Sequence, residues 1–317
     1  MKSFKATACA KFILLGEHFI VHRACSAIVF PIPDLQCVVK LTPNNHQHYK
    51  AEFPVSDVPK EVIENYMARA TYAACSMMGV DITLQPLRVE SSSNFPISRG
   101  FGSSASFSVA LVQAINEYRK FLNGQPLLNE NLMKTAYSVE SLFHKNSSGV
   151  DTTAVLQGRP LLYEKINQFQ RIHNSCVDFV LVDSGQREGA SSFVEKTTTF
   201  KEKNEKLWEG FSKKMQTLVH ECVQALQGID AKTVGCITLE AHGILLELGL
   251  SSPVVEELLL EARKVGALGG KVSGAGGGGA VVLITKKSHG LILSNQLKQK
   301  GYAVISVVTG EEPGAFV

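Results

Sequence analysis

The second half of the chain places its expected strands and helices in an order that few folds accommodate. Val177–Asp183 is an apolar, β-rich run, and two or three long helical patterns follow it between Ser191 and Ala267. The remaining expected elements are two short strands, a helix and a closing strand, at Gly269–Ser273, Ala280–Thr285, His289–Lys300 and Tyr302–Val308. This is the split βαβ order, with extra helices inserted after its first strand.

The first half begins with strands and continues with helices, so the fold class is expected to be α+β. Its expected strands are Lys5–Leu15, Phe19–His22, Ala27–Pro31, Gln36–Leu41 and Ile82–Glu90. Apolar residues at helical spacing predict a helix over Pro59–Met78, one that ends near Phe121 and one over Glu130–His144. A polar loop, Lys145–Asp151, follows. We therefore expect two domains, residues 1–178 and 179–317.

Composition excludes several classes of protein. Hydrophobic residues make up 44% of the 317 and the net charge is +3, which suits a chain with a sizeable core. There is no run of five Lys or Arg and no apolar run of about 18 residues, so neither a nucleic-acid surface nor a membrane span is expected. Seven Cys without a CxxC pair argue against a disulfide framework or a zinc site and for a reducing, cytoplasmic compartment.

A glycine-rich segment, Gly100-Phe101-Gly102-Ser103-Ser104, opens the helix that ends near Phe121. Glycines let backbone amides approach an anion closely, and a helix N-terminus adds unpaired N–H groups and a favourable dipole. The two hydroxyls at its end could contact phosphate or a magnesium ion. A tight turn with a serine cap explains the same residues, so this segment alone leaves both interpretations open.

A second glycine cluster, Gly274–Gly279, matches the dinucleotide pattern GxGxxG, but Ala280–Ile284 after it is a strand and not a helix. It therefore fails the structural requirement for a dinucleotide fingerprint. No P-loop is present either, because Val272 stands where Ser or Thr must follow Gly270-Lys271. A flexible hairpin is one interpretation; the cluster favours close packing of the backbone against a ligand or another loop.

The charged candidates are weak when each is taken singly. Glu140 on a helix could belong to a solvated face, and Asp151 in a Ser/Gly loop could be a turn former. Lys11 near the end of the first strand precedes Gly16-Glu17-His18, which could be a charged turn. His18 and His22 have helical zinc-ligand spacing, but the residues between them are expected to form a strand, which makes zinc improbable.

Three segments in the right order resemble the GHMP small-molecule kinases. They are Lys11–His18, Pro96–Ser104 with its Gly-Phe-Gly-Ser-Ser ending, and Lys271–Gly279 with Val-Ser-Gly-Ala-Gly-Gly-Gly-Gly. The continuation Phe19–His22 and the run that ends Ser-Ser-Gly-Val-Asp at Asp151 are most similar to the mevalonate kinases of that superfamily. The resemblance implies an N-terminal lobe like ribosomal protein S5 domain 2 and a ferredoxin-like C-terminal lobe.

The same resemblance implies ATP-dependent phosphorylation of mevalonate with Mg²⁺ as cofactor. Asp151 is implied as the catalytic base, and Lys11 as the lysine that contacts this aspartate and the reacting hydroxyl. The implied magnesium ligands are Ser104 and Glu140, and the implied substrate-binding residues are Glu17, His18 and Asp151. The implied ATP-binding residues form the phosphate loop: Ser98, Arg99, Gly100, Phe101, Gly102, Ser103 and Ser104.

The match has departures from the family pattern. Ser98 stands where a glycine is common in the phosphate loop, and Arg99 is an unusual charge there. These two residues put the backbone path and the nucleotide affinity of the loop in question. The segment Asp183–Arg187 resembles a stretch that lines the pocket from the second lobe.

Three rival interpretations remain. One is another GHMP kinase, acting on a sugar, homoserine or phosphomevalonate; Glu17-His18 and Phe19–His22 argue against it. A second is a non-catalytic ligand sensor, which the joint presence of Lys11 and Asp151 with the implied magnesium ligands disfavours. A third is a dinucleotide oxidoreductase. This chain lacks the acidic residue that such an enzyme carries at the end of a following strand. The expected partners are mevalonate and ATP, without nucleic acid or membrane; a homodimer and a peroxisome-like organelle are left open.

Overall fold

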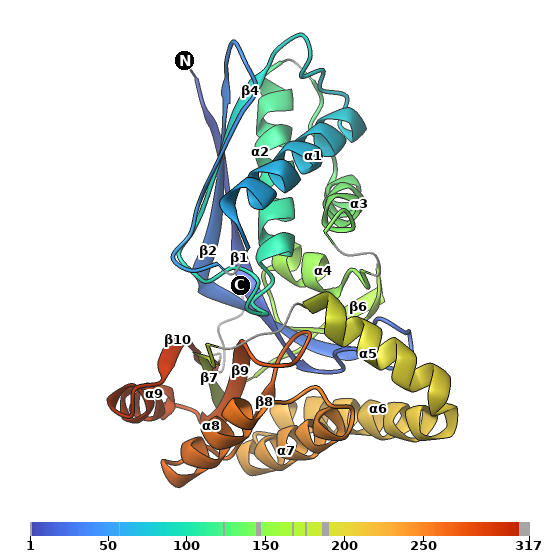
Figure 1. Ribbon diagram of the computed structural model, residues 1–317, viewed down its shortest axis with the longest axis vertical. Helices are drawn as coiled ribbons and strands as arrows, with labels where there is room; N and C mark the ends of the chain where they lie inside the picture. The colour runs from blue at the N-terminus through green and yellow to red at the C-terminus, as the bar shows by residue number, and fades with distance from the viewer. Residues whose placement is uncertain are drawn as a thin grey trace. The chain divides into compact units, whose positions relative to one another are not determined.

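The computed structural model describes residues 2–56, 58–122, 124–143, 147–166, 168–174, 176–185 and 190–310 (Figure 1). The chain divides into two compact units. The first holds the residues up to Lys11 together with Pro31–Gly158, and the second holds Phe12–Phe30 together with the chain from Arg159 onward. Two long strands, β1 (Phe4–Leu15) and β2 (Ala27–Pro43), pass from one unit into the other. The expected division of the domains at residue 178 stays a prediction.

The first unit packs helices against a sheet. The later half of β2 pairs antiparallel with β4 (Leu87–Ser93), and β3 (His48–Glu52) pairs parallel with β4. The helices of this unit are α1 (Lys60–Met77), α2 (Ser103–Phe121), α3 (Asn129–Glu140) and α4 (Val150–Gln157). Figure 1 shows α1 and α2 on one face of these strands. Most residues of α2 are buried, as its strongly apolar sequence requires.

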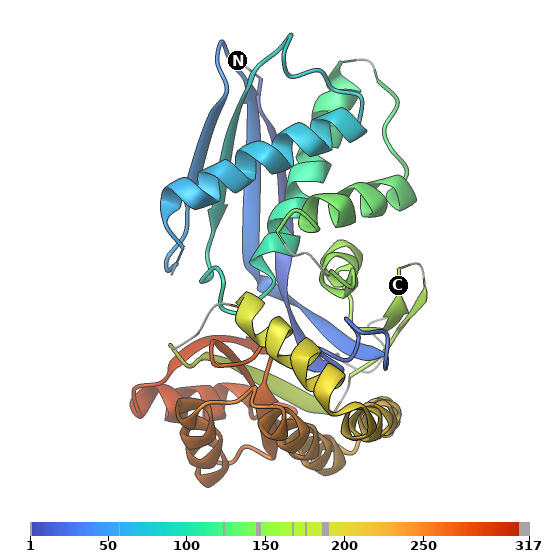
Figure 2. The same ribbon diagram turned by 45° about the vertical axis from the view of Figure 1, so that its right-hand side comes forward.

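The second unit contains a four-stranded antiparallel sheet in the order β10-β7-β9-β8. Its strands are β7 (Val177–Asp183), β8 (Gly269–Val272), β9 (Ala280–Lys286) and β10 (Ala303–Val308). The helices are α5 (Ala190–Lys203), α6 (Glu205–Gln227), α7 (Ala231–Glu247), α8 (Pro253–Lys264) and α9 (Gly290–Gln299), as Figure 2 also shows. Strand β5 (Leu161–Lys165) pairs with the start of β2 and with β6 (Gln168–Arg171). The split βαβ order expected from the sequence is confirmed.

Several expected elements differ from the observed ones. Phe19–His22 is a turn and not a strand. Phe19 and Ile20 are buried there, and the Phe19 ring stacks on Trp208 with 4.7 Å between centroids. One continuous strand, β2, replaces the two strands expected at Ala27–Pro31 and Gln36–Leu41. It can contain Pro31 and Pro33 because these lie between the residues that pair with β5 and those that pair with β4.

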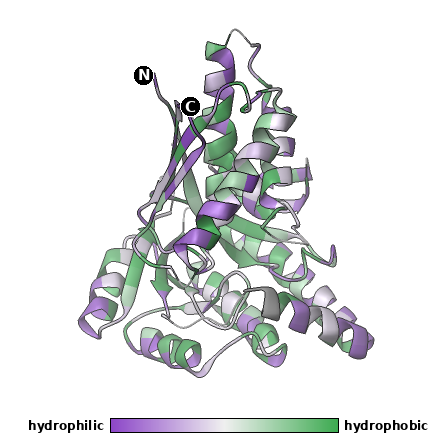
Figure 3. Cartoon of the chain, turned by 45° about the horizontal axis from the view of Figure 1, so that its top comes forward, coloured by the Kyte–Doolittle hydropathy of each residue, from purple (hydrophilic) through white to green (hydrophobic). Residues whose placement is uncertain are grey.

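Other differences concern the ends of elements. The strand expected from Ile82 begins at Leu87, and four helices lie where two or three were expected. The expected loop Lys145–Asp151 is wrong at its end, because Val150 and Asp151 already belong to α4. Figure 3 shows apolar residues concentrated on the strands and the inner helical faces. Within the described residues, no helix is long and apolar enough to cross a membrane.

Candidate active site

The glycine-rich segment forms a tight turn that ends at the N-terminus of α2. Ser98, Gly100 and Gly102 have φ values of 58°, 93° and 77°, all in the left-handed region. The Ser103 hydroxyl accepts a hydrogen bond from the Ser98 amide at 3.3 Å, and Gly102, the residue before the helix, provides no side-chain cap. Ser98 thus adopts a left-handed conformation that glycine takes freely, at a steric cost of roughly 1–2 kcal/mol for a residue with a side chain.

Gly102 is required by its closeness to Lys11. A Cβ atom at residue 102 would lie 2.6 Å from Cε and 2.8 Å from Cγ of Lys11. The Lys11 amide also donates a hydrogen bond to the Phe101 carbonyl at 3.0 Å. The glycine therefore lets the aliphatic stem of Lys11 cross the start of α2, a role that the anion-binding interpretation of this segment did not include.

Lys11 and Asp151 form an ion pair, with 2.8 Å between Nζ and Oδ2. The lysine side chain is 3% exposed and that of Asp151 is 26% exposed. Asp151 is the second residue of α4, where the helix dipole favours a carboxylate. Its other oxygen, Oδ1, is buried and has no hydrogen-bond partner in the described part of the chain. This arrangement leaves one carboxylate oxygen available to accept a proton.

Glu140 is buried and does not lie on a solvated helix face. Its carboxylate, 2% exposed, accepts hydrogen bonds at Oε2 from Thr152 Oγ1 and, at 3.3 Å, from Ser147 Oγ. Burial, and next the negative charge of Asp151, raise the pKa of Glu140 to about 7, while Thr152, Lys11 and Ser147 act in the opposite direction. Sequence reasoning missed Thr152, whose only signal was its place beside Asp151.

The donor set of this unit fits a magnesium ion. No group of three His, Cys, Asp or Glu that could hold a metal occurs in the described ranges. Mg²⁺ needs no such group, because it keeps several waters and binds through one or two carboxylates and substrate phosphates. Two neighbouring carboxylates, Glu140 and Asp151, share one nearby ammonium group, so the cluster favours an added cation. Magnesium binding by Ser104 and Glu140 stays a prediction.

In the second unit, Glu17 and His18 lie in a buried turn. Lys271 Nζ contacts Glu17 Oε1, and Thr197 Oγ1 lies 3.5 Å from His18 Nδ1. The pKa of His18 is lowered to about 4, chiefly by burial; the backbone of Ala275 opposes this shift, and the charge of Lys271 adds to it. The imidazole is therefore neutral near pH 7. Thr197 and Lys271 were not among the predicted site residues.

The second glycine cluster packs against other segments of the same unit. A Cβ atom on Gly276 would lie 2.7 Å from the Leu250 carbonyl, and one on Gly277 would lie 2.0 Å from the Phe193 ring. The Gly277 amide donates to the Leu250 carbonyl at 2.8 Å. Of the two partners considered for this cluster, a ligand or another loop, the structure shows protein neighbours at these two positions.

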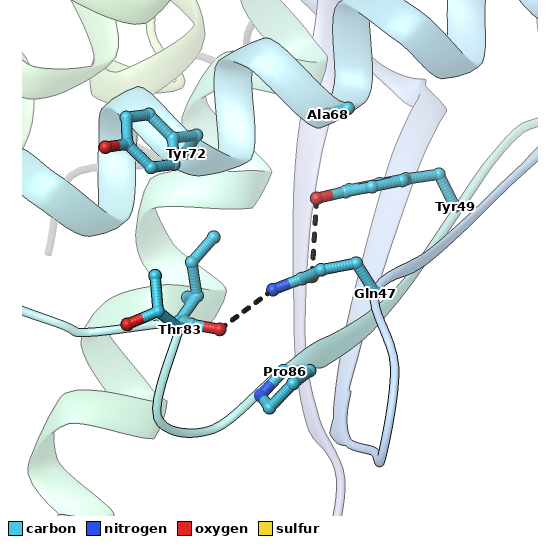
Figure 4. Close-up of a pocket in the computed structure, with 7 residues that line it drawn as sticks. Gln47, Tyr49, Ala68, Tyr72, Thr83 and Pro86 are labelled. Atoms are coloured by element: carbon cyan, nitrogen blue, oxygen red, sulfur yellow. Dashed lines mark hydrogen bonds between the residues drawn. The ribbon is translucent and has the colours of Figure 1, made fainter.

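Other predicted residues are placed as follows. Arg99 is 6% exposed, which makes it a buried cation of the phosphate loop. Gln186 and Arg187 lie outside the described residues. A separate open pocket has a volume of about 510 Å³, and in it the Gln47 side chain donates to the Ile82 carbonyl at 3.0 Å. Figure 4 shows side chains that line this pocket, Gln47 among them. None of the predicted site residues lines this pocket.

Comparison with known families identifies this arrangement. The sequence profile of the GHMP kinases N terminal domain matches residues 65–159, and that of the GHMP kinases C terminal domain matches residues 222–303. Together the two matches span more than half of the chain. The chain belongs to the GHMP kinases. The family expected from the sequence motifs is thus confirmed, and the protein is a phosphotransferase.

This GHMP kinase is similar over nearly its whole length to proteins named mevalonate kinase. It is 27% identical over 300 residues to the one from Aeropyrum pernix, covering 91% of this chain and 90% of that protein. The mevalonate kinase from Thermococcus onnurineus is 27% identical over 328 residues, which cover 96% of this chain and 96% of that protein. The crystal structure of L. major mevalonate kinase with R-mevalonate has a TM-score of 0.81 at 24% identity, with 98% and 97% coverage. The expected two-lobed fold is confirmed.

Proposed function

We propose that this GHMP kinase phosphorylates mevalonate at its primary hydroxyl, with ATP as phosphate donor and Mg²⁺ as cofactor. The chemistry is supported by the Lys11–Asp151 ion pair and by the Oδ1 atom of Asp151, which has no hydrogen-bond partner among the described residues. The choice of mevalonate is supported by the residues Gly16–His22 and by the names of the relatives. The product would feed isoprenoid and sterol precursor synthesis in the cytoplasm.

Asp151 acts as the general base. A primary alcohol is a poor nucleophile, and a carboxylate that takes its proton as the bond to phosphorus forms contributes roughly 10²–10⁴-fold. The Oδ2 atom is held by Lys11, so the geometry of the carboxylate is fixed while Oδ1 receives the proton.

Lys11 stabilises the developing negative charge on the hydroxyl oxygen, and Gly102 leaves the space that its stem requires. The left-handed turn from Ser98 to Gly102 leads into the α2 N-terminus, whose unpaired amide groups would bind the ATP phosphates. Magnesium, held by Glu140 and Ser104, would neutralise charge on the phosphate oxygens. Neutral His18 would bind the alcohol as a hydrogen-bonding group without adding charge.

The test is ADP release measured in parallel with mevalonate, galactose, homoserine and phosphomevalonate. Mevalonate is expected to give the highest kcat/KM. Asp151→Asn, purified in the same way, is the control that excludes a contaminating kinase, and it should lose the activity. Equal or greater turnover of another alcohol by the parent protein would contradict the substrate assignment and leave the phosphoryl-transfer chemistry standing.

A further inference from the structure

Two side chains, Lys271 of β8 and Ser273 just after its end, contact the Phe12–His18 segment. Lys271 and Ser273 are two residues apart, so they lie on the same face of an extended segment. The Ser273 hydroxyl accepts from the Ile13 amide at 3.1 Å and donates to the Ile13 carbonyl at 2.9 Å. Lys271 Nζ contacts Glu17 Oε1 and donates to the Val272 carbonyl at 2.7 Å. The end of β8 and the residue after it thus hold both ends of the segment that leads to His18.

The Lys271–Glu17 pair is withdrawn from water. The side chains of the two residues are 0% and 2% exposed. A buried ion pair costs desolvation on both sides, and a well-packed apolar pair of similar size is commonly as stable. Removing one partner alone is costly, because an uncompensated charge is left in the interior. The pair is therefore weak evidence for stability of the fold, and its position between two segments suits a role in fixing local geometry.

The turn that the pair holds is a strained one. His18 has a φ of 60°, in the left-handed region that residues with a side chain seldom adopt. Gly16 has a φ of 92°, and a Cβ atom there would lie 2.2 Å from the Ser26 carbonyl oxygen. Such geometry persists only where the surrounding contacts over-determine it. Glu17 is the residue between these two, and its carboxylate is the one engaged by Lys271.

We propose that Lys271 is a positioning residue for the alcohol-binding turn: through Glu17 it fixes the conformation at Gly16–His18 in which His18 meets the acceptor substrate. This inference rests on the proposed function, in which His18 binds the alcohol. Lys271 itself touches neither substrate, and its effect is transmitted by the ion pair. Loss of the pair should therefore weaken binding of the alcohol and leave ATP binding unchanged.

The experiment compares Lys271→Met, the double variant Glu17→Gln/Lys271→Met, and Ser273→Ala as the matched control, since Ser273 follows β8 directly and contacts the same segment. KM for the alcohol, KM for ATP, kcat and Tm are measured for each. Lys271→Met is expected to raise KM for the alcohol about tenfold or more while KM for ATP stays within about twofold. The double variant, which leaves no uncompensated charge, should recover part of that loss. Ser273→Ala should lower Tm without this separation of the two KM values.

The outcomes separate this inference from the proposed function. The alcohol used is the one that the parent protein phosphorylates best, so failure with mevalonate overturns the proposed substrate and not the role of Lys271. A parental KM for the alcohol in the double variant would overturn the inference, and this holds even if Lys271→Met alone fails to fold. A double variant weaker than Lys271→Met would also overturn it, because Glu17 would then bind the alcohol directly.

Discussion

Replacing Glu140 by Gln is expected to stabilise the magnesium-free protein at pH 8, although it removes a predicted metal ligand. Burial and the charge of Asp151 raise the pKa of Glu140 from 4.5 to about 7. The folded state therefore binds this proton more tightly than the unfolded chain does. Stability from this group is present below about pH 4.5 and is lost as the pH rises to about 7. Gln cannot ionise, so the variant keeps at pH 8 the part of the folding stability that the parent loses when Glu140 ionises.

The magnitude follows from the size of the shift. A difference of about 2.5 pKa units corresponds to about 3.5 kcal/mol at about 1.4 kcal/mol per unit. This figure is a ceiling, because the interaction with Asp151 is shared between the two carboxylates. The free energy of unfolding of the variant relative to the parent should thus rise by about 1–3 kcal/mol between pH 5 and pH 8.

The assay is urea unfolding in the presence of EDTA at both pH values. Glu130→Gln is the matched control, since Glu130 lies on the same helix and its side chain is exposed. The control should show no comparable change between the two pH values. A Glu140→Gln difference that stays within about 0.5 kcal/mol from pH 5 to pH 8 would refute the reasoning, because it would mean that Glu140 is ionised without cost.

Three further predictions concern the phosphate loop and the metal. Glu140→Gln and Ser104→Ala should each raise the magnesium concentration needed for half-maximal rate while mevalonate binding is kept; parental titrations in both would contradict the metal assignment. Arg99→Ala should raise KM for ATP or mevalonate, since Arg99 is a buried cation in the loop, and two unchanged values would contradict a role in anion binding. Gly102→Ala should lower kcat about tenfold or more, because the new methyl group displaces Lys11; single-turnover rates test this, and a parental rate contradicts it.

The order of strands and helices in the C-terminal lobe was predictable because it depends on local sequence patterns. The strands and helices from Val177 to Val308 follow local apolar patterns, so their order could be read without knowing any long-range contact, although not the number of helices after the first strand. Phe19–His22 shows where this approach fails. Its apolar residues predict a strand, but in the structure they belong to a turn in which Phe19 packs against Trp208. A distant partner, and not the local pattern, determines the structure there.

The same limit applies to the site. Lys11, Glu140 and Asp151 could be proposed from motif letters, yet the burial of Glu140 could not, because it depends on Thr152 and Ser147 folding back over the end of α3. Lys271 belongs to a recognised motif but was given no role. Its partner Glu17 is 254 positions away in the sequence, so no spacing rule connects them.

The rate of Asp151→Asn in a single turnover tests the central claim most directly. The variant keeps the size of the side chain and can still meet Lys11, but it cannot accept a proton. With nucleotide binding confirmed, the rate should fall about 10²-fold or more, and kcat and kcat/KM should fall together. Lys11→Met, measured beside it, shows how much of the rate depends on the lysine. A rate for Asp151→Asn within about threefold of the parent would contradict the general-base role, since a loose transition state would then need little help from a base.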